Sequence, residues 1–162
     1  MHVVQKDFNY NPEKMKSIFD STTRAGLIER INTLNENSTP QWGKMNIYQM
    51  LKHCTVYEEM MLGKNRYKRA FIGRLFGRMA LKEFTQDESL IKRNVPTLPE
   101  LKVKADHGDV TAERKKWIAL LEEYPNAACN DIEHSFFGKL TKEQVGTLVY
   151  KHTDHHLRQF NS

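Results

Sequence analysis

Three of the seven histidines lie within five positions near the C-terminus, in the segment YKHTDHHLRQF, residues 150–160. In a helix, His152 and His156 would be one turn apart, which places both imidazoles on one face. Two neutral imidazoles at this spacing are suited to bind one divalent cation. The same rings could instead be core side chains that are satisfied by hydrogen bonds. The spacing alone leaves both interpretations open.

The helix that carries these histidines has an apolar stripe, formed by Val145, Leu148 and Val149. Extending the stripe by whole turns reaches His152 and His156, and then Gln159. The imidazoles are therefore expected to point into the protein interior, where each ring nitrogen needs a partner.

Other side chains of this helix are expected elsewhere. His155 lies on the shoulder of the buried face, whereas Lys151, Asp154 and Arg158 lie outside it. Asp154 and Arg158 have the i, i+4 spacing of an ion pair in solvent.

A third metal ligand must come from another helix, and the segment QMLKHC supplies His53. It lies on the shoulder of a stripe that includes Met50 and Cys54. In isolation, His53 could equally be a hydrogen-bonded core residue. Cys54 turns about 100° away from its neighbour His53, so we interpret it as a small buried hydrophobe.

The elements that must position these residues are helices, because apolar periodicity is helical and no convincing strand alternation is present. The expected fold is all-α: a four-helix bundle in one domain spanning 1–162, with an extra basic amphipathic helix between helices two and three. The principal helices are expected within residues 21–35, 46–62, 109–124 and 141–160, and the extra one within 66–84. An extended connection is expected over 94–108.

Two helix starts carry capping-box patterns. Asn46 and Gln49 form one, and Thr141 and Gln144 form the other. Gly63 is expected to end the helix that begins at Asn46.

Composition narrows the function classes. Hydrophobic residues make up 39% and charged residues 28% of the 162 positions, which is typical of a globular protein. We expect no membrane span, no secretory signal and no disulfide between Cys54 and Cys129, and hence a cytoplasmic location. The net charge of +5 raises the question of anionic partners without answering it.

A histidine early in the second helix, followed by an HxxxH pair in the last, resembles the pattern of the DinB/YfiT-like superfamily. The segments that carry the likeness are PQWGKMNIYQMLKHC, NVPTLPEL, and HSFFGKLTKEQ with YKHTDHHLRQF. The likeness runs from about residue 21 to residue 160 and is specific at its two ends. The quoted segments are similar to one uncharacterised subfamily of that group.

This resemblance implies a four-helix bundle with three histidine ligands, which carry over onto His53, His152 and His156. His155 matches a non-ligand position. The cofactor implied is a divalent transition metal, zinc or nickel first and iron as an alternative. The expected partner is a small-molecule substrate, with a low-molecular-weight thiol and a second copy of the chain as further candidates.

By the same resemblance, the expected activity is that of a metal-dependent thiol transferase, with metal-hydroxide hydrolysis second. No zincin motif is present, since Thr153 follows the first histidine of the pair. No general base is evident, because Asp154 points away from the metal face. A purely structural metal is a third possibility.

Several residues are weaker candidates for supporting roles. Gln49 and Gln159 could orient ring nitrogens, Tyr57 could face the same cavity, and His134 could approach it. His2 and His107 are expected to have no role.

The alternative function rests on the segment from Lys64 to Lys82, which contains seven basic and no acidic residues. Apolar residues are interleaved at helical spacing, as in helices that bind an anionic membrane surface or nucleic acid. The preferred interpretation is that the apolar side packs on the bundle and the arginines face water. Nucleotide binding is not indicated, since GRLFGR lacks phosphate-loop spacing.

Overall fold

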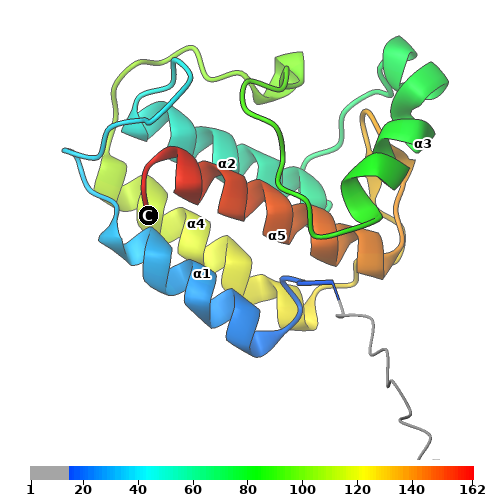
Figure 1. The fold of residues 1–162 in the computed structure, drawn as a ribbon, viewed down its shortest axis with the longest axis horizontal. Helices are drawn as coiled ribbons and strands as arrows, with labels where there is room; N and C mark the ends of the chain where they lie inside the picture. The colour runs from blue at the N-terminus through cyan, green and yellow to red at the C-terminus, as the bar shows by residue number, and fades with distance from the viewer. Residues whose placement is uncertain (1–14) are drawn as a thin grey trace, which may run out of the picture.

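The computed structural model describes residues 15–162. Four long helices, α1 (Ser21–Thr33), α2 (Ile47–Met61), α4 (Val110–Glu123) and α5 (Lys142–Gln159), form a bundle (Figure 1). In this bundle α1 and α2 each contact both α4 and α5. A further helix, α3 (Phe71–Thr85), lies at the end where α5 begins. The expected all-α bundle with an extra helix is confirmed.

The capping residues set the helix boundaries near the site. Asn46 and Gln49 form a complete capping box at the start of α2, and Thr141 and Gln144 form the same arrangement at the start of α5. Gly63, with a φ of 73°, follows α2 in the left-handed conformation that glycine adopts most easily. Both predicted boxes are confirmed, so sequence-local hydrogen bonds fix where the two histidine-bearing helices begin.

One hydrophobic core joins the four bundle helices. The first helix, α1, contributes Leu27 and Ile31, and α4 contributes Trp117, which is fully buried. Each helix has an apolar face of this kind, and burying these faces against one another favours the bundle. The largest fully buried apolar side chains are Trp117, Tyr124, Ile18, Ile31, Leu34, Met50, Leu51, Met61, Leu121 and Leu157.

Short elements connect the helices. A 3-10 turn, η1 (Pro99–Leu101), lies within the connection from α3 to α4, and a second, η2 (Tyr124–Asn126), follows α4. A two-stranded antiparallel hairpin precedes α5, with β1 (Glu133–His134) paired to β2 (Gly138–Lys139). This hairpin was not expected, because two residues a strand are too short to show alternation.

The orientation of α3 is opposite to the expected one. Five of its large apolar residues face outward, and its buried residues are Gly73, Gly77 and Leu81. A Cβ atom at Gly73 or Gly77 would collide with the backbone of Phe136, so the missing side chains let the helix approach the hairpin. The prediction that the apolar side packs on the bundle is therefore wrong.

Two further expectations concern membranes and thiols. Among residues 15–162, no helix is long and apolar enough to cross a bilayer. Cys54 and Cys129 are both buried and unpaired, as expected. The Cys54 thiol lies 3.6 Å from the Met50 sulfur, in an apolar setting. Cys54 is thus the small core residue that its helix position predicts.

Candidate metal centre

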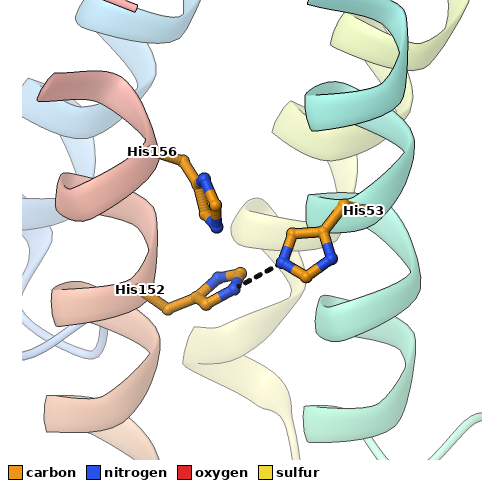
Figure 2. Close-up of side chains that lie close together, drawn as sticks. All are labelled: His53, His152 and His156. Atoms are coloured by element: carbon orange, nitrogen blue, oxygen red, sulfur yellow. Dashed lines mark hydrogen bonds between the residues drawn. The ribbon is translucent and has the colours of Figure 1, made fainter. Parts of the chain in front are cut away.

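The imidazoles of His53, His152 and His156 converge inside the bundle (Figure 2). His53 comes from α2, and the other two lie one turn apart on α5. One nitrogen from each ring can be chosen so that all three lie within 4.8 Å of one another. The Nε2 atoms of His53 and His152 are 3.0 Å apart. Residues about 100 positions apart in the chain thus form one cluster.

A backbone carbonyl from another part of the chain orients His53. Its Nδ1 lies 2.9 Å from the carbonyl oxygen of Leu101, at the end of η1. A carbonyl oxygen only accepts, so Nδ1–H donates and the lone pair lies on Nε2, which faces the other two rings. Orientation of an imidazole by a carbonyl behind it is a common feature of metal-binding histidines.

The amide of Gln159 orients His156 in the same sense. The His156 Nδ1 lies 2.8 Å from the Gln159 Oε1 atom, and the Gln159 Nε2 donates to the carbonyl of Trp42 at 2.9 Å. The second bond fixes which end of the amide is the oxygen, so His156 donates from Nδ1. Its Nε2 lone pair is left for the cluster, and the predicted contact between Gln159 and His156 is present.

His152 completes the cluster with one unsatisfied nitrogen. Its ring stacks on Tyr57, with centroids 3.7 Å apart and planes 18° apart. Because His53 offers a lone pair on Nε2, the short contact requires His152 to donate from its own Nε2. The buried Nδ1 of His152 then has no partner among the described residues. His152 can present an Nε2 lone pair by carrying its proton on Nδ1 instead.

The imidazoles are held in the neutral form. Burial lowers the pKa of His53, and it lowers the pKa of His152 and His156 well below the ordinary value. In the two α5 residues, the neighbouring imidazoles lower the pKa further. Neutral imidazole is the form that binds a metal.

The donor set fits a divalent transition metal. In a tetrahedral zinc site with N–Zn bonds of about 2.0–2.1 Å, ligand nitrogens lie about 3.3 Å apart. The present nitrogens lie within 4.8 Å, so small ring rotations would reach that spacing. The two fixed tautomers, of His53 and His156, also agree with a cation among the rings. The assignment of these residues as metal ligands stays a prediction.

No carboxylate belongs to the cluster among the described residues. Asp154 is bonded to Arg158, as expected, but also to Arg30 of α1, at 2.8 and 2.7 Å. Its side chain is only 13% exposed, so the pair is not a solvent pair. Lys151 is buried as well, and it lines a small pocket together with residues 88–91.

Glu58 is a buried acid that the sequence analysis missed. It is fully buried on α2 and accepts a 2.5 Å hydrogen bond from the Tyr124 hydroxyl. Thr153, next to His152, donates to its other oxygen at 3.4 Å. Burial raises the pKa of Glu58 to about 8, so it is mainly protonated at neutral pH. A signal was present, since Glu58 lies one turn after Cys54 on the apolar stripe.

Two supporting candidates do not contact the imidazoles. The Gln49 side chain completes the capping box by accepting from the Asn46 backbone N–H, so it is not free to orient a ring. His134, in β1, accepts from the backbone of Phe136 and Phe137 at 3.1 and 3.2 Å. Its ring lies 6.4 Å from that of Tyr57, outside the cluster.

The remaining histidines do not belong to the cluster. His155 is buried beside Trp42, with ring centroids 5.6 Å apart, and is not one of the three clustered rings. His107 is exposed and paired with Asp106. His2 lies outside the described residues. The two carbonyls that orient the cluster, at Leu101 and Trp42, carried no residue-type signal in the sequence.

The fold and this site define a class: a helical bundle with a buried three-histidine cluster between two of its helices. The model of a protein family of unknown function, DUF1569, matches residues 14–162. The chain belongs to this family. No curated protein and no solved structure matches it.

Proposed function

We propose that the protein is a DinB/YfiT-like, metal-dependent enzyme that acts on a small molecule through the three-histidine cluster. The observation that carries the proposal is the set of three neutral imidazoles, in which Leu101 and Gln159 direct the Nε2 lone pairs of His53 and His156 into the cluster. Structural core histidines are satisfied when their ring nitrogens are hydrogen-bonded to the surrounding protein. Convergence of three rings on one another, with the Nε2 lone pairs of His53 and His156 directed into the cluster, favours a ligand.

His53, His152 and His156 would hold the metal, with zinc or nickel as the first candidates and iron as an alternative. Three imidazoles leave at least one coordination position for water or substrate, as in catalytic rather than structural sites. When bound, such an ion acidifies a thiol or a water molecule and polarises a carbonyl.

The surrounding residues support transfer to or from a thiol. Tyr57 covers one face of His152, and α2, which carries His53, also contributes buried apolar residues to the core. Because the described residues place no carboxylate in the cluster, the chain itself offers no general base there. A thiol that has lost its proton before reacting needs none. Thiol transfer is therefore our first proposal, and hydrolysis is the alternative.

Metal content tests the ligand set. Protein purified without an affinity tag or a nickel column is expected to contain close to one equivalent of metal by elemental analysis. His152→Ala and His156→Ala are expected to lose it, whereas His155→Ala, a change on the same helix outside the cluster, keeps it. Circular dichroism verifies that each variant folds. Folded wild-type protein that takes up no zinc, nickel or iron would contradict the proposal.

Reaction class is tested separately with the metal-loaded protein. Mercaptoethanol and an aryl chloride probe thiol transfer, and an activated ester probes hydrolysis. Thiol transfer that is lost on chelation and in His152→Ala supports the first proposal. Ester hydrolysis with the same dependence supports the alternative. Full metal binding with neither reaction would favour a structural metal.

A further inference from the structure

The outer face of α3 exposes large apolar side chains in one continuous arc. We use the name α3 outer face for its five residues, whose exposed fractions are 74% for Phe71, 60% for Ile72, 61% for Leu75, 51% for Phe76 and 68% for Met79. At 100° per residue, they cover about 140° of the helix circumference. A contiguous exposed apolar surface of this kind commonly marks an interaction site, whereas single exposed apolar residues are ordinary.

The opposite side of α3 fixes this orientation. Gly73 and Gly77 pack against the backbone of Phe136, and Arg69 donates to the carbonyl of Gly73 at 3.0 Å. Arg78 donates to the carbonyl of Lys139 at 3.1 Å, which ties the helix to the same hairpin. The glycine side is committed to the bundle, so turning the outer face inward would bring bulky residues where only glycine fits. The packing of the glycine side therefore keeps the α3 outer face exposed.

Positive charge borders the α3 outer face. Arg74, Arg78 and Lys82 follow one another at i, i+4 along one edge of it, and all three are exposed. From Lys64 to Lys82 the chain contains no acidic residue, and the next residue, Glu83, is paired with Lys92 at 3.9 Å. An apolar arc with cations along its edge matches a lipid surface, where acyl chains lie beneath anionic headgroups.

We propose that α3 lies in the plane of an anionic membrane surface and docks the protein there. The five residues of the outer face enter the boundary between headgroups and acyl chains, while Arg74 and Lys82 contact phosphate and carboxylate groups. A second copy of the chain is a poorer occupant, because pairing two such faces brings like charges together. Nucleic acid is also less suited, because aliphatic side chains such as Ile72 and Leu75 offer phosphates and bases no hydrogen bond.

Vesicle sedimentation tests the proposal with the full chain. The wild-type protein is expected to bind vesicles rich in phosphatidylserine, to bind pure phosphatidylcholine far more weakly, and to dissociate as salt rises. The double variant Leu75→Ser with Met79→Ser is expected to lose binding by more than ten-fold. Both substitutions are at exposed positions, and circular dichroism verifies the fold.

A charge-matched pair of variants separates docking from bulk attraction. Arg74→Gln with Lys82→Gln removes two charges beside the outer face, at an expected cost of about five-fold in affinity for each. Lys44→Gln with Lys115→Gln removes two exposed charges elsewhere and is expected to leave binding nearly unchanged. Equal losses in both pairs would overturn the proposal, as would equal binding to the two vesicle types.

The rival occupants give different results. Sedimentation equilibrium that shows a dimer, broken by Leu75→Ser with Met79→Ser in protein that does not bind vesicles, would assign the face to a second copy. Binding to a labelled duplex that depends on the α3 outer face, again without vesicle binding, would assign it to nucleic acid. Either result overturns membrane docking and leaves the metal proposal untouched.

Discussion

At the residue scale, Gln159 connects the imidazole cluster to the chain before α2. Its Oε1 accepts from His156, its Nε2 donates to the Trp42 carbonyl, and its backbone carbonyl accepts from the Gln41 N–H at 2.7 Å. The side chain therefore sets a ring tautomer while holding a loop. Groups of this kind behind a metal ligand typically change affinity by one or two orders of magnitude.

Gln159→Ala should weaken metal binding about 10- to 100-fold, because His156 loses the acceptor that holds its Nδ1–H. Isothermal titration with zinc measures this. Gln41→Ala is the control, since Gln41 contacts Gln159 through its backbone N–H and that bond survives. Equal affinities for wild type and Gln159→Ala would show that the amide does not act on a ligand.

Glu58 makes stability depend on pH. Its pKa rises from 4.5 to about 8 on burial, so the folded state retains a proton that the unfolded state releases. Its contribution is fully present below pH 4.5 and is lost as pH rises toward 8, at about 1.4 kcal/mol per pH unit. Glu58→Gln, which stays neutral, should flatten this decline. Urea unfolding at several pH values between 5 and 8 measures the free energy of unfolding for both proteins.

Glu29→Gln provides the comparison for this effect, because Glu29 is exposed on α1. It should leave the pH dependence of the unfolding free energy unchanged. A decline as steep in Glu58→Gln as in the wild type would mean that Glu58 is ionised in the folded protein.

At the scale of elements, local signals predicted the bundle helices well. The capping boxes at Asn46 and Thr141 depend on residues three positions apart, so the sequence alone contains both partners. The side of α3 that packs on the bundle was predicted wrongly, for a different reason. The apolar stripe is real, but Gly73 and Gly77 on the opposite side decide the packing, through a close approach to a hairpin that no periodicity indicates.

Two helical glycines offer a matched test of that explanation. Gly77→Ala should lower stability, since the new Cβ meets the Phe136 carbonyl, whereas Gly26→Ala should raise it by about 0.5–1 kcal/mol because nothing lies within 4 Å of the new atom. Hydrogen exchange should show faster exchange in α3 for Gly77→Ala only. A gain in stability for both variants would contradict the tight packing of α3.

At the scale of the whole molecule, the candidate site gathers parts that are distant in sequence. His53 and His156 could be named in advance because helix faces are periodic and the resemblance supplied a pattern. The carbonyls of Leu101 and Trp42 could not, because any residue has a carbonyl and only the path of the chain brings these two to the rings. The sequence thus predicts which side chains converge, and the fold determines how they are oriented.

The central claim, that these three imidazoles bind one metal ion, can be tested by direct observation. Anomalous X-ray scattering from crystals of the zinc-loaded protein, collected at the zinc absorption edge, locates the metal independently of any assay. We predict a single strong peak about 2.0–2.1 Å from one nitrogen each of His53, His152 and His156. A peak elsewhere, or none while the three rings keep the 3.0 Å contact between His53 and His152, would contradict the account.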